Sequence, residues 1–508
     1  MIPPPTERTL GPRVQQLLHD LVDRFDRRRV DVLALRTARR KQLQAGDVDL
    51  LADTEHVRRT AWRVDPLPPE LMERRVEFLG GSLRSDLIHG LNAGAKSYIA
   101  DLWNFTTNDT WSIVRAHRAL ERAARMDLAY LDPVEGRVRA NPNSPTRLMV
   151  APRPLWVLES SVLEGDEPVP ASFFDLAMLR VHVLPALKER QGGLYLVLRD
   201  VHGHLEARLW SQLFDALEQD ADLPRGSIRA TVMIDSIAGA LEMDEILFEL
   251  MHHAAGISID PQAYAADHIA LFHGPDVPVF PDRETIGLNA SFLRALSLHS
   301  IGIAHKRGCH AIGPASFILP SRDPLMLKKE YLEMLADKER EALDGCDGTL
   351  VIHAGTINAA MAEFNKVMPR AHQMDYLRED DIRPVDLIER PTGVITVESL
   401  VSCIRTIIRS LVQRAQGNAH VVQGGRSHDR SSLRLALRLL WQWNHSRHGV
   451  VTATKLEIHE ALLRYLVKKE ADKMYADADD HTKTLAKRAV QLTLDSVLSE
   501  NVPLEPQV

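Results

Sequence analysis

Short apolar runs alternate with longer stretches of helical spacing through the central half of this chain. A run of four or five mostly apolar residues is typical of a strand that is buried on both faces, and strands that alternate with helices form parallel sheets. The runs lie at 97–100, 148–151, 195–198, 230–234, 268–272, 309–312 and 349–352. Seven such strand–helix repeats favour an α/β fold with a closed (β/α)8 TIM barrel, whose eighth strand the pattern does not locate.

Helical sequence flanks this central region on both sides. Residues 12–45 combine Leu, Arg, Gln and Ala at helical spacing, and the proline-rich segment 65–70 ends that pattern. Beyond residue 370 the strand-like runs stop, and long helices are expected at 397–415 and 431–443. We therefore predict an N-terminal helical cap (1–85), a TIM barrel (86–372) and a C-terminal helical domain (373–508).

The composition excludes several classes of protein. Apolar residues make up 45% and charged residues 26% of the 508 residues, which is typical of a soluble globular chain. The net charge of −7 argues against a nucleic-acid surface, which normally carries a basic excess. Cys309, Cys346 and Cys403 show no zinc-ligand spacing and no disulfide framework, and MIPPPTERTLGPRV lacks the apolar core of a signal peptide. We expect a cytoplasmic protein that binds neither nucleic acid nor a membrane.

Three charged residues stand where a barrel of this kind places its chemistry. Asp235 directly follows the run 230–234, Arg153 follows the run 148–151, and Asp429 precedes an amphipathic helix. The active sites of parallel barrels lie at the carboxyl ends of the strands. Each residue also has a structural alternative, because an aspartate often caps a helix and an arginine at a strand end is usually structural.

Ordered segments over nearly the whole chain resemble the malate synthases. The clearest is 223–250, with PRGSIRATVMIDSI followed by EMDEILFEL, and LNAGAKSYIAD (91–101) looks like the first barrel strand of that family. Further matches lie at 54–80, 203–210, 337–355, 417–422 and 439–443. The resemblance implies that acetyl-CoA and glyoxylate, or a related 2-oxo acid, condense to malate and CoA with Mg²⁺ as cofactor, as in the glyoxylate cycle.

The resemblance also implies a role for each of the three charged residues. Asp429 aligns with the base that removes a methyl proton from acetyl-CoA, and the dipole of its helix would favour the ionised form. Arg153, in VAPRPLW, resembles an arginine that would stabilise the enolate. Asp235 stands where the family has a glutamate ligand of magnesium.

Several positions depart from the pattern of the family. Ala263 stands where a second metal-binding aspartate is expected, with Asp260 and Asp267 nearby as substitutes. Trp103 and Asn104 replace two carboxylates after the strand 97–100. In LVLRDVHGHLEAR, Asp200 and His202 replace lysine and glutamate.

Two alternatives follow from these departures. His202 with His204, or His252 with His253, suggest a histidine site for zinc, iron or manganese. The protein would otherwise be a diverged homologue that acts on another 2-oxo acid or 2-hydroxyacyl thioester, or one that only binds its ligand. His353 ends the run 349–352, and Gly345 and Gly348 mark either a turn before that strand or a close approach of the backbone to a ligand.

Overall fold

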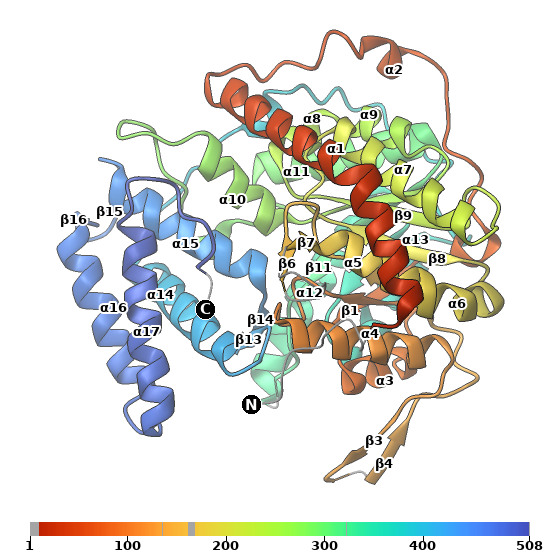
Figure 1. Ribbon diagram of the computed structural model, residues 1–508. Helices are drawn as coiled ribbons and strands as arrows, with labels where there is room; N and C mark the ends of the chain where they lie inside the picture. Colours follow the sequence, from red (N-terminus) through yellow and green to blue (C-terminus); the bar gives the residue numbers. More distant parts are fainter. Residues whose placement is uncertain (1–9, 135, 161–167, 322, 507–508) are drawn as a thin grey trace.

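A closed barrel of eight parallel strands forms the centre of the protein (Figure 1). The structure, a computed structural model, describes residues 10–134, 136–160, 168–321 and 323–506. Each strand pairs with the next barrel strand along the chain, and β12 closes on β1. The strands are β1 (Val76–Gly80), β2 (Ser97–Asp101), β5 (Arg147–Ala151), β8 (Leu194–Leu198), β9 (Ile228–Ile234), β10 (Ala254–Ile259), β11 (His310–Ser316) and β12 (Gly348–Val351). The predicted (β/α)8 barrel is confirmed.

Six of the seven predicted strand segments lie in barrel strands, and one is wrong. Residues 268–272 fall on helix α10 (Pro261–Leu271) and its C-cap rather than on a strand. The side chain of Asp260 starts this helix by accepting from the N–H groups of Gln262 and Ala263. From Ala263 onward every residue of α10 is buried, so a short window of it has the uniformly apolar character of a buried strand.

Two barrel strands escape the sequence pattern. β1 lies inside the range 1–85 assigned to the helical cap, so the barrel starts before residue 86. The segment 91–101, expected to hold the first strand, therefore holds the second one. β10 reads AAGISI, and its small residues carry little of the branched, bulky character that marks a strand.

Helices and two hairpins surround the barrel. The helices are α3 (Arg84–Asn92), α4 (Thr110–Ala124), α5 (Ala171–Met178), α6 (Leu184–Gln191), α7 (His204–Asp220), α8 (Ile237–Leu241), α9 (Met243–Glu249), α10, α11 (Ser291–Arg307), α12 (Pro324–Asp344) and α13 (Ile357–Val367). The hairpins are β3 (Ala129–Asp132) with β4 (Gly136–Arg139), and β6 (Leu158–Glu159) with β7 (Val169–Pro170). None of the helices in the described ranges combines the length and the apolar character that a membrane span needs.

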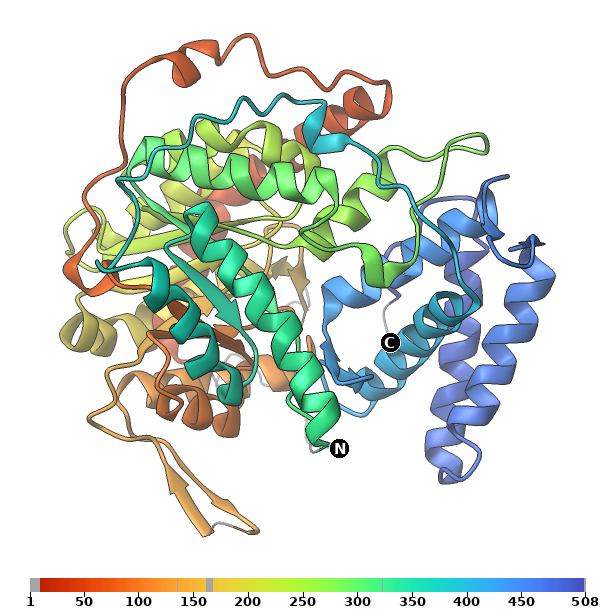
Figure 2. The ribbon, with the colours of Figure 1, turned by 180° about the vertical axis from the view of Figure 1, so that it is seen from behind.

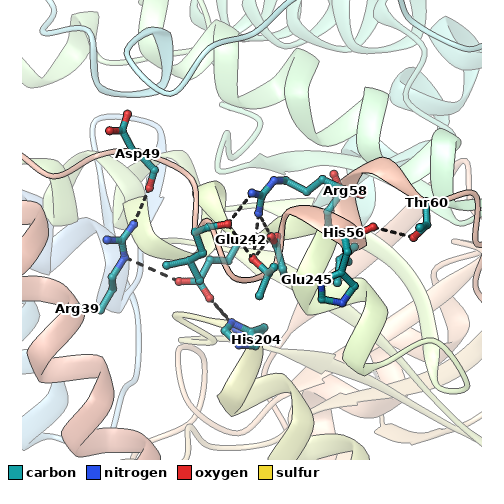
Figure 3. Close-up of polar contacts among 12 residues, drawn as sticks. Arg39, Asp49, His56, Arg58, Thr60, His204, Glu242 and Glu245 are labelled. Carbon is teal, nitrogen blue, oxygen red and sulfur yellow. Dashed lines mark hydrogen bonds and ion pairs between the residues drawn. The ribbon is translucent and has the colours of Figure 1, made fainter.

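The N-terminal part of the chain lies along the outside of the barrel. α1 (Pro12–Gln44) is one long helix that packs against α5 and α7. The segment that follows, with α2 (Glu55–Arg59), is held by an ion pair between Arg58 and Glu245 of α9 (Figure 3). Residues 1–9, which belong to the segment predicted to lack a signal peptide, lie outside the described residues.

A helical domain built from the last part of the chain lies beside the barrel (Figures 1 and 2). Its helices are α14 (Val397–Ala415), α15 (Arg430–His445), α16 (Glu460–Met474) and α17 (Asp480–Val497), with hairpins β13 (Val421–Gln423)–β14 (Arg426–His428) and β15 (Val450–Val451)–β16 (Leu456–Glu457). The predicted helices at 397–415 and 431–443 are confirmed. α15 packs along α10, and Arg426 bridges to Ile318 after β11. These contacts hold the N-terminus of α15 over the carboxyl ends of the strands.

The barrel is filled and tightly closed. Its interior holds Leu71, Leu79, Ile99, Phe105, Met149, Ala151, Tyr195, Val197, Met233, Ala255, Ile312 and Leu350. Near the amino ends of the strands, Arg74 and Glu77 form a buried ion pair at 2.8 Å. Gly345 ends α12 with φ of +109°, whereas Gly348 is a close approach: a Cβ there would lie 1.8 Å from the carbonyl oxygen of Arg74. Gly345 is therefore a turn glycine, as one alternative had it, whereas the close approach at Gly348 is to the protein's own backbone rather than to a ligand.

We expect Gly348→Ala to destabilise the barrel, because the added methyl group would meet the Arg74 backbone where β12 closes on β1. Overpacking of this kind lowers the free energy of unfolding by about 1–3 kcal/mol. Chemical denaturation measures the loss. Gly287→Ala is the control, because nothing lies within 4 Å of its Cβ position. Equal stability of the two variants would contradict the prediction.

Candidate active site

A cavity of about 570 Å³ lies at the carboxyl ends of the barrel strands, beneath the start of α15. Its wall includes three charged residues that come from separate parts of the chain: Arg199 after β8, Asp260 after β10, and Asp429 before α15. Apolar and polar neighbours complete the wall, among them Met233, Arg283, Pro314, Phe317, His428 and Leu435. The cavity therefore exists only where the C-terminal domain meets the barrel.

Asp429 is a buried helix cap on this wall. Its Oδ1 accepts from the N–H of Ser432 at 3.0 Å, and its Oδ2 accepts from Nδ2 of Asn104 at 3.2 Å. Burial, and next the charge of Asp260, raise the pKa of Asp429 to about 6. The N–H of Ser432 at the start of the helix favours the ionised form, as expected, but burial outweighs this effect. Asp429 is therefore both the cap of α15 and a buried acid with a raised pKa.

Arg199 is the cation that faces Asp429. Its Nε donates to Oδ2 of Asp101 at 3.1 Å, and its Nη1 lies 3.4 Å from Oδ2 of Asp260. The guanidinium is only 4% exposed, yet it reaches the cavity wall, and its charge interacts with those of Asp429 and Asp235. A permanently charged group is therefore placed among buried carboxylates at the barrel mouth.

Asn104 and Trp103 take over structural tasks at the positions where the resemblance implies carboxylates. The backbone N–H groups of both residues donate to Oδ1 of Asp101 at 2.7 Å. Besides Asp429, the amide of Asn104 reaches Oγ of Ser431, which itself donates to Oδ2 of Asp260 at 2.7 Å. The ring of Trp103 lies under the guanidinium of Arg430, 3.7 Å from its centroid. An amide donor therefore orients Asp429 without adding a second charge.

Asp235 lies at the end of β9, as predicted, but its neighbours are new. One ligand atom from each of Asp200, His202 and Asp235 lies within 4.8 Å of the others. Oδ2 of Asp235 accepts from the N–H of Asp200 at 2.7 Å, and Oδ1 is buried without a hydrogen-bond partner. Burial, and then the charge of Asp200, raise the pKa of Asp235 well above its usual value. The cluster could hold a cation.

Asp260 and Asp267, which were expected to complete a metal site with Asp235, bind other groups of the protein instead. Oδ1 of Asp267 pairs with Arg40, and its Oδ2 accepts from the N–H of Ile237. Asp260 caps α10 and binds Ser431 and Arg199. The group of three around Asp235 includes neither of them. Ala263 is buried within α10 and offers no ligand atom.

Arg153 lies outside the cavity wall and is fully buried. Its Nε and Nη2 bind both oxygens of Asp175 at 2.8–3.2 Å, and its Nη1 binds Glu159. Although burial opposes it, Arg153 and then His117 lower the pKa of Asp175 to about 2. Each nitrogen of the guanidinium already faces an acceptor, so the geometry supports the structural alternative for Arg153.

The histidine pairs of the sequence do not converge. His204 turns away from His202 and binds Glu242 through Nδ1 at 2.7 Å, beside Arg39 (Figure 3). His252 and His253 precede β10, at the opposite end of the barrel from the cavity, where His253 contacts Asp215 and the carbonyl of Ile228. His353 is exposed and caps the turn after β12. His202 groups with Asp200 and Asp235 after β8 and β9, whereas His253 groups with Asp215 and Glu218 at the other end of the barrel.

Sequence reasoning missed Arg199, Asp101 and Ser431. Arg199 and Asp101 stand at the carboxyl ends of buried strands, which is the same signal that identified Asp235. Ser431 carried no such signal, because its neighbour Asp260 is 171 positions away in the sequence.

Comparison with known proteins points to one family. The sequence profile for "Malate synthase, TIM barrel domain" matches residues 147–390. A malate synthase of Streptomyces clavuligerus is 34% identical over 462 residues, which cover 88% of this chain and 85% of that protein. Malate synthase A of Escherichia coli (strain K12) is 30% identical over 90% of this chain and 86% of its own length. A malate synthase of Myxococcus xanthus (strain DK1622) is 32% identical over 88% and 82%.

Arg153→Met is expected to destabilise the fold, because it leaves the buried carboxylates of Asp175 and Glu159 without their guanidinium partner, and only His117 still faces Asp175. Breaking a buried ion pair in this way lowers the free energy of unfolding by about 3–5 kcal/mol. Denaturant titration at neutral pH measures it. Arg59→Met, which removes an exposed partner of Glu55, should change stability by less than about 1 kcal/mol. An Arg153→Met protein as stable as wild type would exclude the structural role.

Proposed function

Because this chain belongs to the malate synthase family, we propose that it condenses acetyl-CoA with glyoxylate and releases malate and CoA. The observation that carries the proposal is the meeting of Asp429 and Arg199 on one cavity wall, a base facing a cation at the mouth of a barrel shared with malate synthases. The methyl carbon of acetyl-CoA bonds to the aldehyde carbon of glyoxylate, and water then cleaves the thioester of the malyl-CoA formed. This reaction is the malate-forming step of the glyoxylate cycle.

Asp429 is proposed as the base that takes the methyl proton. With a pKa of about 6 it is mostly ionised at neutral pH, yet it is basic enough to accept a proton from a weak carbon acid. The hydrogen bonds from Ser432 and Asn104 fix the orientation of the carboxylate. Burial keeps water from competing for the proton.

Arg199, rather than Arg153, is proposed to stabilise the enolate oxygen. The guanidinium of Arg199 reaches the cavity and is already positioned by Asp101 and Asp260, so it needs no rearrangement when negative charge develops on the substrate. Arg153 has no such access, because Asp175 and Glu159 occupy it.

The magnesium implied by the resemblance does not match the donors of this chain. Magnesium prefers an octahedral shell of oxygens. Around Asp235 the chain offers two carboxylates and one imidazole, and Ala263 supplies nothing. A divalent cation bound near the aldehyde would make its carbon more electrophilic. The roles proposed for Asp429 and Arg199 rest on the positions of these two side chains and not on the metal ligands.

A cytoplasmic location is part of the proposal. Cys309, Cys346 and Cys403 are all buried and free. Unpaired cysteines of this kind support a reducing compartment.

Thiol release from acetyl-CoA in the presence of glyoxylate and a divalent cation tests the reaction. Asp429→Asn keeps the helix cap and removes the base, so turnover should fall by about 10²–10⁴. Arg199→Met should lower it by about 10²–10³. Asp479→Asn, which changes the exposed cap of α17 in the same way, should leave turnover unchanged. Folded protein that releases no thiol with magnesium or manganese would refute the reaction, and a fully active Asp429→Asn variant would refute the base.

The pH dependence gives a second test. Asp429 acts in its deprotonated form, so kcat/KM should fall as the pH drops through about 6 and level off above it. Asn104→Asp places a second carboxylate where Nδ2 of Asn104 now lies 3.2 Å from Oδ2 of Asp429. The added charge disfavours the ionised form of Asp429 and should move this limb of the profile to higher pH. Asn104→Ala, which removes the donor without adding charge, should move it less. A limb that stays in place in Asn104→Asp would contradict the assignment.

A further inference from the structure

We infer that Asp200, His202 and Asp235 form a mixed carboxylate–imidazole site that prefers Mn²⁺ to Mg²⁺. None of the three side chains lines the cavity described above, so the inference concerns cation binding itself, which can be measured without substrate. Asp200 and His202 follow β8 and Asp235 ends β9, so two neighbouring strands of the barrel supply the three ligands. Their ligand atoms lie within 4.8 Å of one another, and all three side chains are more than nine-tenths buried.

The unpartnered oxygen of Asp235 is the first reason to expect a ligand. Oδ1 is buried and accepts no hydrogen bond, although Oδ2 of the same carboxylate accepts one from the N–H of Asp200. A buried carboxylate oxygen normally has a partner, and a second carboxylate close by makes an unpartnered oxygen more unfavourable. A cation between Asp200 and Asp235 satisfies that oxygen and removes the repulsion.

The backbone of Asp200 fixes the arrangement of the cluster. Its φ of +53° lies in the left-handed region, which aspartate adopts more readily than most residues. This conformation directs the N–H of Asp200 onto Asp235 and keeps its carboxylate near His202, 3.6 Å from Nε2.

His202 is the second reason, because it supplies a nitrogen donor. Its imidazole is buried beside the two carboxylates, and its Nδ1 has no hydrogen-bond partner. In the structure Nη2 of Arg36 lies 2.7 Å from Nε2 of that ring. Arg36 also donates to the carbonyl of Asp200 and pairs with Glu206. Arg434 also lies 3.7 Å from the carboxylate of Asp200. The two guanidiniums therefore supply the positive charge that a bound cation would provide, and Arg36 keeps two other partners when a metal takes the ring nitrogen.

The donor set decides the preferred metal. A nitrogen ligand favours first-row transition metals over magnesium, and carboxylates suit manganese well. The alternative group of Asp215, Glu218 and His253 has no comparable buried atom without a hydrogen-bond partner. Glu218 accepts from the N–H groups of Gly226 and Ile228, and both ring nitrogens of His253 have partners.

Titration of chelator-treated full-length protein with Mn²⁺, followed by the electron paramagnetic resonance of free Mn²⁺, tests the site. We expect one Mn²⁺ per chain, and at least a tenfold weaker affinity in His202→Asn and in Asp235→Asn. His202→Glu converts the site to oxygen ligands and should lower the Mn²⁺-to-Mg²⁺ affinity ratio about tenfold. Arg36→Met removes the competing cation and should strengthen Mn²⁺ binding. His253→Asn is the matched control and should bind like wild type.

The site is refuted if wild-type protein binds no Mn²⁺, if folded His202→Asn and Asp235→Asn variants bind it as tightly as wild type, or if Mg²⁺ displaces Mn²⁺ at equal concentration. Thermal denaturation of each variant shows that it is folded. Thiol release without Mn²⁺ binding would overturn this inference alone. Mn²⁺ binding without thiol release from acetyl-CoA and glyoxylate would overturn the proposed function and leave the metal site standing.

Discussion

The arrangement of the barrel mouth depends on the pairing of Arg199 with Asp101 and Asp260. Carboxylates removed from water stay ionised only when a cation or hydrogen-bond donors compensate them. Arg199 contacts the carboxylates of Asp101 and Asp260 directly, and the packing of α15 against α10 brings Asp429 into the same buried region. The raised pKa of Asp429 follows from that placement, because burial and the charge of Asp260 outweigh the favourable helix terminus and Arg199.

The departures from the family pattern change which groups surround the buried carboxylates of the barrel mouth. Asn104 stands where a carboxylate is expected and supports Asp429 with an amide donor instead of opposing it with a charge. Ala263 offers no ligand atom at one side of the mouth, whereas Asp200 and His202 lie next to Asp235 at the other side.

Both ends of the chain contribute to this compensation. Arg36 of α1 lies 3.7 Å from the carboxylate of Asp200, and Arg434 of α15 lies at the same distance. Although burial opposes it, Arg434 and then His202 lower the pKa of Asp200. The barrel alone would leave this carboxylate without a counter-charge. The N-terminal helix and the C-terminal domain are therefore part of the site as well as of the fold.

The sequence by itself determined the barrel, the helices at 397–415 and 431–443, and the position of Asp235 at a strand end, because burial imposes a periodicity that can be read locally. It misplaced one strand on α10, where burial on all sides erases that periodicity. Only the tertiary structure decided which charged residues meet. Arg153 and Arg199 both follow barrel strands, but Asp175 and Glu159 enclose the first, whereas the second faces Asp429. Contacts between residues far apart in the chain set burial and charge pairing, and no local pattern records them.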